Sequence, residues 1–185
     1  MEPYARKLFH AVGVVIVAAY WYLPIRQEQA AAVCLGVAAL LALVDLFRAR
    51  SPAVQALFFK LLGKITAEKD RTGLNGSTLY FTGCGLTILL FDKPIACAGI
   101  LCLALGDALA AVVGMSVKSP QWKGSSVAGS TTCFVVCTAV CWLFVGFPLA
   151  LVGGLAATVL EAVSGSKNDN LLIPIGTAAA LWLVA

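Results

Sequence analysis

Residues 106–130 read GDALAAVVGMSVKSPQWKGSSVAGS and place one carboxylate, Asp107, inside an apolar run that a basic, Gly/Ser-rich loop follows. The apolar run, residues 94–117, is long enough to cross a membrane as a helix. An aspartate near the centre of such a helix costs about 2.5 to 3.5 kcal/mol on insertion scales. That cost indicates a role for Asp107, either in chemistry or as a structural residue that neighbouring hydroxyl groups satisfy.

Small residues recur on one side of this segment. Gly106, Ala110 and Gly114 fall four residues apart, so they form a stripe along one helix face. Small side chains let the backbone of a neighbouring helix approach closely. The stripe therefore predicts a tight helix contact, and ordinary helix packing explains it without any catalytic role.

The composition is that of a membrane protein. The chain has 185 residues, of which 61% are hydrophobic and 12% charged, and its mean hydropathy is +0.94. These values, with several long apolar runs, indicate an integral membrane protein and give no reason to expect a nucleic acid partner. No shift of composition divides the chain, so residues 1–185 are expected to form a single polytopic domain.

Apolar runs bounded by charged residues, Pro or Gly predict an all-α fold with about seven transmembrane helices. The predicted spans are residues 8–24, 30–47, 77–91, 94–117, 127–146, 148–164 and 171–185. Between the second and third spans, Ser51 and Pro52 mark a helix start. Apolar side chains recur at helical spacing from Val54 onward, with Lys60 and Lys64 off that face. This segment is expected to be an amphipathic helix on the membrane surface.

The basic residues predict the orientation. All thirteen Lys and Arg residues except Arg26 and Lys93 flank the same ends of the predicted spans. By the positive-inside rule these ends are cytoplasmic. The N-terminus and an active site on that face are therefore expected in the cytoplasm, and the small size of the chain suggests a prokaryotic plasma membrane.

Seven cysteines raise the question of a metal or disulfide site, since Cys133, Cys137 and Cys141 share one helix face. The chain has no CxxC sequence and a single His. All the cysteines lie in or near apolar runs, where cysteine behaves as a small buried hydrophobic residue. Packing is therefore the favoured interpretation.

Acidic and basic side chains from separate segments converge on the predicted cytoplasmic face. The carboxylates are Glu68, Asp107, Glu161 and Asp169, and the cations are Arg6, Lys7, Lys118 and Lys123. Carboxylates suit a hard cation such as Mg²⁺, and Lys and Arg neutralise phosphate oxygens. Residues 123–126 also open a predicted helix, whose first N–H groups could bind phosphate. These features predict chemistry on a magnesium-bound polyphosphate, although no Walker A or protein-kinase sequence is present.

Five segments occur in the order and spacing found in one enzyme family. They are RKLFH (6–10), EKDRTGLNGSTLYF (68–81), GDALAAVVG (106–114), KSPQWKGSSVAGS (118–130) and EAVSGSKNDNLLIPI (161–175). Together they resemble the CTP-dependent lipid kinases, which include dolichol kinase, phytol kinase and the yeast-type diacylglycerol kinase. The resemblance implies transfer of the γ-phosphoryl group of CTP to the hydroxyl of a long-chain lipid alcohol. It does not specify which alcohol.

The resemblance also implies roles for single residues. Asp107 with Asp169 or Glu161 is expected to hold magnesium, and a remaining carboxylate to act as the base. The expected nucleotide-binding residues are Arg6, Lys7, His10, Lys118, Lys123, Gly124, Ser125 and Asn170. His10 is expected either to orient a phosphate or the alcohol, or to pack between helices. Further candidates are Glu68, Asn75 and Gly106.

Two other functions stay open at this stage. The CTP:phosphatidate cytidylyltransferases also have a GD-type helix and a Lys/Gly loop, but their basic pair and terminal Asp-Arg are not visible here. A small membrane transporter would need polar groups across the outer half of the membrane as well. Residues 11–22, 32–44, 127–146 and 171–185 carry no charge, which disfavours transport.

The orientation can be tested with single introduced cysteines. We expect Pro120→Cys to react with a membrane-impermeant thiol reagent only from the cytoplasmic side, and Asp92→Cys only from the outside. The unmodified chain gives the background from its native cysteines. Labelling of position 120 from outside, or of position 92 from inside, would contradict the topology.

Overall fold

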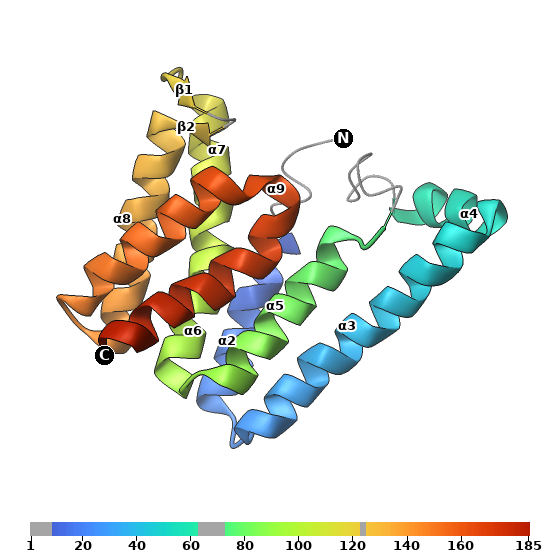
Figure 1. The fold of residues 1–185 in the computed structure, drawn as a ribbon, viewed down its shortest axis with the longest axis horizontal. Coiled ribbons are helices and arrows are strands. Elements are labelled where there is room, and N and C mark those ends of the chain that lie inside the picture. Colours follow the sequence, from blue (N-terminus) through green and yellow to red (C-terminus); the bar gives the residue numbers. More distant parts are fainter. Residues whose placement is uncertain (1–8, 63–72, 123–124) are drawn as a thin grey trace.

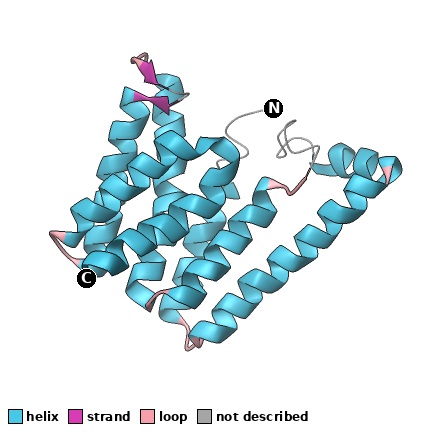
Figure 2. Ribbon diagram, viewed as in Figure 1, coloured by secondary structure: helices cyan, strands magenta, loops and turns pink. Residues whose placement is uncertain are grey.

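The computed structural model describes residues 9–62, 73–122 and 125–185, and the fold of these residues is all-α apart from one short hairpin (Figures 1 and 2). The expected all-α class is therefore confirmed. In chain order, the first helices are α2 (Ala11–Tyr22), α3 (Gln27–Arg50) and α4 (Pro52–Leu62). They are followed by α5 (Gly76–Leu90), α6 (Lys93–Leu101), the π-helix η2 (Cys102–Asp107) and α7 (Ala108–Ser116).

The last part of the chain begins with an antiparallel hairpin of β1 (Gln121–Trp122) and β2 (Ser125–Ser126), in which Gln121 pairs with Ser126. Helices α8 (Val127–Val145) and α9 (Leu149–Val184) complete the fold. Between them, Gly146 ends α8 with a φ of 74°, a conformation that residues with a Cβ rarely adopt. The hairpin replaces the loop expected between the fourth and fifth helices.

Helix α9 reverses direction along its length, as its orange first part and red last part show in Figure 1. The two parts pack against each other. A Cβ atom on Gly153 would lie 3.1 Å from Leu181 Cδ2, and one on Gly176 would lie 2.6 Å from Leu160 Cδ1. The two spans expected at residues 148–164 and 171–185 are thus joined as one continuous helical segment with antiparallel parts.

Three helical segments in the described residues are long and apolar enough to cross a membrane: Gln27–Arg50, Lys93–Ser116 and Val127–Val145. The apolar helices Ala11–Tyr22, Gly76–Leu90 and Leu149–Ser164 are shorter. The expected count of about seven spans, and the side of the membrane on which each end lies, remain predictions. Helix α4 begins at Pro52 as expected, because proline is favoured in the first turn of a helix.

Large apolar side chains cover the outside of the bundle. Val15, Val33, Leu143 and Trp182 are 67%, 67%, 83% and 58% exposed. Exposed apolar side chains on several helices mark a surface that contacts lipid rather than water. The chain is therefore a membrane protein in both its composition and its surface.

The expected small-residue stripe packs on α8. A Cβ atom on Gly106 would lie 2.2 Å from Cys137 Sγ, and one on Gly114 would lie 2.7 Å from Ser126 Oγ. From the other side, a Cβ on Gly129 would lie 2.9 Å from Ala110 O. The prediction of a tight helix contact is confirmed. All seven cysteines are free and buried, in agreement with a packing role.

Helices α5 and α9 are in close contact at Gly83. A Cβ atom there would lie 2.4 Å from the backbone oxygen of Asn170, which cannot move without shifting α9. We expect Gly83→Ala to destabilise the folded protein by about 1 to 3 kcal/mol, the usual cost of overpacking. Thermal unfolding in detergent measures this change.

Gly36→Ala is the matched control, because Gly36 lies inside α3 with nothing within 4 Å of an added Cβ. Replacing a glycine inside a helix by alanine gains about 0.5 to 1 kcal/mol. We therefore expect an unchanged or higher unfolding temperature for Gly36→Ala. Equal unfolding temperatures for the two variants would contradict the close contact between α5 and α9.

Candidate functional site

Asp107 is the last residue of the π-helix η2 and is 5% exposed. A π-helix inserts an extra residue into a helical turn, and such segments are rare and frequent at functional sites. The apolar run was expected to be one regular helix, so the π-helix is a feature that the hydropathy pattern does not reveal. It sets the direction in which the side chain of Asp107 projects from the helical segment Lys93–Ser116.

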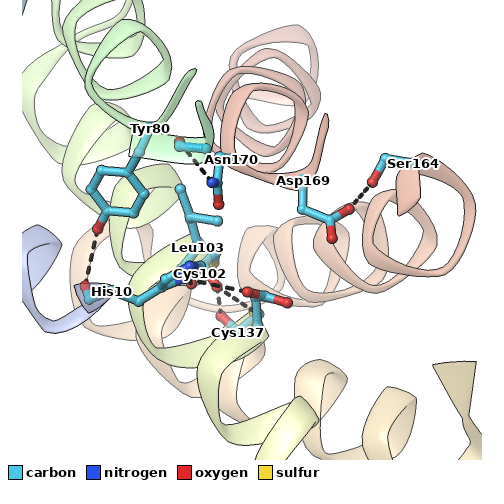
Figure 3. Close-up of polar contacts among 10 residues, drawn as sticks. His10, Tyr80, Cys102, Leu103, Cys137, Ser164, Asp169 and Asn170 are labelled. Atoms are coloured by element: carbon cyan, nitrogen blue, oxygen red, sulfur yellow. Dashed lines mark hydrogen bonds and ion pairs between the residues drawn. The ribbon is translucent and has the colours of Figure 1, made fainter. Parts of the chain in front are cut away.

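His10, which is labelled in Figure 3, lies just before α2 and contacts this carboxylate. Its Nδ1 is 3.3 Å from Asp107 Oδ2 and 3.4 Å from the carbonyl oxygen of Leu103. The hydroxyl of Tyr80 donates a hydrogen bond of 3.0 Å to the backbone oxygen of His10, and the two rings are 5.4 Å apart. His10 is 3% exposed, so the contact with Asp107 is buried. The structure thus joins the first of the five sequence segments to the third.

Glu161 contacts the strand hairpin. The hydroxyl of Ser125, in β2, donates a hydrogen bond of 3.1 Å to Glu161 Oε1 in α9. Both residues were expected in the site, Ser125 as a nucleotide-binding residue and Glu161 as a catalytic or metal-binding one. Their contact couples the fourth and fifth sequence segments.

Asp169 and Asn170 lie next to each other on α9 and are 6% and 9% exposed. Asp169 accepts a hydrogen bond from the hydroxyl of Ser164 on the same helix. The side-chain amide of Asn170 donates a bond of 2.9 Å to the backbone oxygen of Gly76 at the start of α5. Figure 3 shows both residues, with Asp169 directed toward Ser164. Asn170 therefore has a structural contact between helices, in addition to any role with nucleotide.

Residues 123–126 were expected to bind phosphate where they open α8, and of these only 125 and 126 lie in the described part of the chain, at the N-terminus of α8. The first three backbone N–H groups of α8 already have protein acceptors. Val127 donates to Pro120 O at 2.9 Å, Ala128 to Ser119 Oγ at 3.1 Å and Gly129 to Ser126 Oγ at 3.0 Å. Ser126 accepts the third of these bonds as the N-cap residue, and residues 119–120 supply the other two acceptors. These three N–H groups are therefore not available to a phosphate.

The remaining candidates divide into two groups. Lys118 follows α7 and is exposed, Asn75 caps the start of α5 with its side chain, and Gly106 packs on α8. The others lie outside the described residues: Arg6, Lys7, Glu68, Lys123 and Gly124.

The described residues contain no group of three or more His, Cys, Asp or Glu side chains that could hold a metal ion. Asp107, Glu161 and Asp169 each accept a hydrogen bond or ion pair from a different neighbour instead. A magnesium site made by these three carboxylates alone is therefore not preformed within the described part of the chain. Mg²⁺ needs only one or two carboxylates, however, when substrate phosphates complete its coordination.

A buried polar network that the sequence did not reveal lies where α3 meets α5. Arg48 is 2% exposed and its Nη2 is 2.9 Å from Asp45 Oδ1. Asp45 Oδ2 accepts bonds of 2.7 Å from the N–H of Asn75 and from the hydroxyl of Thr78. The spacing of Asp45 and Arg48 on one helix face is the signal that could have identified the pair. The network fixes the start of α5, which carries Tyr80.

Comparison with known proteins finds relatives that match most of the chain. The chain is 29% identical to an uncharacterised protein of Rickettsia prowazekii, over 92% of this chain and 88% of the relative. It is 28% identical to CTP-dependent diacylglycerol kinase 1 of Schizosaccharomyces pombe, over 76% of this chain and 74% of that kinase. For the Saccharomyces cerevisiae enzyme of the same name the identity is 24%, over 74% and 57%.

The resemblance to the CTP-dependent lipid kinase family is confirmed. No family model matches the chain, and no solved structure does. The resemblance therefore depends on the sequence similarity to whole relatives. It extends over most of the chain, which is the extent expected from the five segments.

Neutralising Asp107 tests whether its charge is needed. We expect Asp107→Asn to lower the rate of the reaction by at least about 100-fold, the usual effect of removing one electrostatic contact to the reacting groups. The protein should still insert and fold, because an amide is easier to bury in the membrane than a carboxylate. Activity per folded protein at saturating magnesium gives the comparison.

Asp92→Asn is the control, since Asp92 is exposed and makes no side-chain capping bond at the start of α6. It should keep the full rate. A wild-type rate for Asp107→Asn would remove Asp107 from the candidate site.

Proposed function

We propose that this chain is a CTP-dependent lipid kinase, which transfers the γ-phosphoryl group of CTP to the hydroxyl of a membrane lipid alcohol and releases CDP. The similarity to two yeast CTP-dependent diacylglycerol kinases, over 76% and 74% of this chain, is the observation that carries the proposal. Diacylglycerol is the alcohol in the names of those relatives. Polyprenol, dolichol and phytol are the other alcohols that the family resemblance implies.

The carboxylates supply the acidic part of the proposed site. Asp107 and Asp169 are both buried, and oxygen ligands of this kind fit a magnesium ion whose remaining ligands are nucleotide phosphates and water. The bound ion would neutralise charge on the phosphoryl oxygens. Asp107 and Asp169 thus orient the triphosphate, and the alternative pair of Asp107 with Glu161 would do the same.

Basic residues supply the other half of the site. Arg6, Lys7, Lys118 and Lys123 are proposed to bind the phosphate oxygens of CTP. Phosphoryl transfer passes through a loose transition state, so positioning and charge neutralisation account for most of the catalysis. Since Lys118 is exposed beside the hairpin, its side chain can reach a nucleotide that arrives from water.

Glu161 is proposed as the base. As the lipid oxygen bonds to the γ-phosphorus, the bond to the β-phosphate oxygen breaks and CDP leaves. The hydroxyl proton passes to Glu161, whose position the hydroxyl of Ser125 fixes. This assignment leaves Asp107 and Asp169 for the nucleotide.

The lipid is proposed to enter from the bilayer. The outside of the helices exposes large apolar side chains, so an acyl or isoprenoid chain can stay in the membrane while its hydroxyl reaches the site. We further propose that the protein resides in a prokaryotic plasma membrane with its site facing the cytoplasm. The similarity to the Rickettsia prowazekii protein supports a prokaryotic source.

Two radiolabels separate kinase activity from nucleotidyl transfer. Purified protein is incubated with diacylglycerol, polyprenol or phytol and with CTP labelled either at the γ-phosphorus or in the cytosine ring. We expect γ-label in the lipid fraction, no cytosine label there, and CDP as the second product. The Asp107→Asn variant serves as the inactive control.

Cytosine label in a lipid fraction, together with pyrophosphate release from phosphatidic acid, would favour a cytidylyltransferase instead. Absence of label in every lipid tested, with solute uptake in proteoliposomes, would favour a transporter. Transfer from ATP at the rate seen with CTP would remove the CTP dependence from the proposal.

A further inference from the structure

The imidazole of His10 lies against two segments that are distant from it in sequence. Tyr80, on α5, bonds to the backbone of His10 and packs an edge against its ring. Leu103 and Asp107, both in η2, lie next to the ring nitrogen Nδ1. The position of the ring is therefore set by the fold on several sides.

The two neighbours of Nδ1 determine whether this nitrogen carries a hydrogen. A backbone carbonyl oxygen, that of Leu103, and a carboxylate oxygen, that of Asp107, lie 3.4 Å and 3.3 Å away. Both oxygens are hydrogen-bond acceptors, so they favour the tautomer in which Nδ1 carries a hydrogen. An unprotonated Nδ1 would instead place its lone pair against two oxygens in a buried site.

We propose that His10 is a positioning residue for Asp107: its Nδ1–H group holds the carboxylate in the orientation that the magnesium–nucleotide complex needs. This inference deepens the proposed kinase function and rests on it. It differs from the sequence expectation that His10 would contact a phosphate or the lipid alcohol directly.

The physical reason is the burial of both groups. A carboxylate that is 5% exposed inside apolar helices is shielded from water, so protein donors must fix its orientation, and the N–H of a rigidly packed ring is one such donor. Groups that orient a metal-binding side chain in this way typically contribute about 10- to 100-fold to metal affinity or activity. The effect of His10 should therefore appear in both nucleotide binding and rate.

The first test determines directly whether Nδ1 of His10 carries a hydrogen. His10 is the single histidine of the chain, so ¹⁵N-histidine labelling gives NMR signals from its two ring nitrogens alone. We expect Nδ1 to be protonated, and its signal to shift in Asp107→Asn, where the partner charge is lost. An unprotonated Nδ1, or a signal that is the same in both proteins, would overturn the proposal whether or not the protein is a kinase.

The second test separates the two ring nitrogens. The amide of His10→Asn places an N–H group close to the position of Nδ1, and that of His10→Gln places one close to the position of Nε2. We expect His10→Asn to stay within a few-fold of the wild type. His10→Gln should lose about 10- to 100-fold in kcat/KM and raise the KM for magnesium–CTP. Mn²⁺ binding, followed by electron paramagnetic resonance with CTP present, gives a readout besides activity.

Tyr80→Phe is the matched control, because it removes a hydrogen bond to the backbone of His10 without touching the ring contact with Asp107. It should keep Mn²⁺ binding. Equal losses in His10→Asn and His10→Gln would overturn the proposal and point to Nε2 as a base. If the wild type binds Mn²⁺–CTP but transfers no phosphoryl group to any lipid, the kinase function fails while the positioning role stands.

Discussion

The burial of one carboxylate constrains much of this structure. Asp107 is in a helical segment of a membrane protein, where an ionisable group without a partner is costly, and the chain places His10 against it. Tyr80 then ties the backbone of His10 to α5. These two contacts bring together His10, Tyr80 and Asp107, which belong to the first three of the five sequence segments.

Glycine contacts place the remaining carboxylates. Gly83 lets α5 meet the backbone of Asn170, and Gly99 lets α6 meet the backbone oxygen of Pro174, 2.5 Å from where a Cβ would be. In a membrane, helices associate through close packing rather than through the hydrophobic effect, so these small residues control the fit. They fix α9 against the centre of the bundle, and α9 carries both Glu161 and Asp169.

Each acidic residue of the proposed site has its own neighbour, and these neighbours differ in kind. His10 faces Asp107, Ser125 donates to Glu161, and Ser164 donates to Asp169. A site of separate, individually oriented carboxylates suits a reaction in which the nucleotide phosphates complete the binding of magnesium.

The sequence by itself determined most of the helices and indicated the resemblance to the lipid kinases. Hydropathy located α2, α3, α5, α8 and the segment Lys93–Ser116 to within a few residues, because a membrane helix is encoded by a local run of apolar side chains. It divided α9 into two spans, since polar residues interrupt the apolar pattern of that helix. It also indicated Asp107, since a charge inside such a run is conspicuous. Only the tertiary structure showed the π-helix, the reversal of α9 and the pairing of His10 with Asp107. It also showed that Pro120 and Ser119 accept hydrogen bonds from the first two N–H groups of α8. These features depend on contacts between distant segments, and no local pattern of residue types specifies which side chain will meet which.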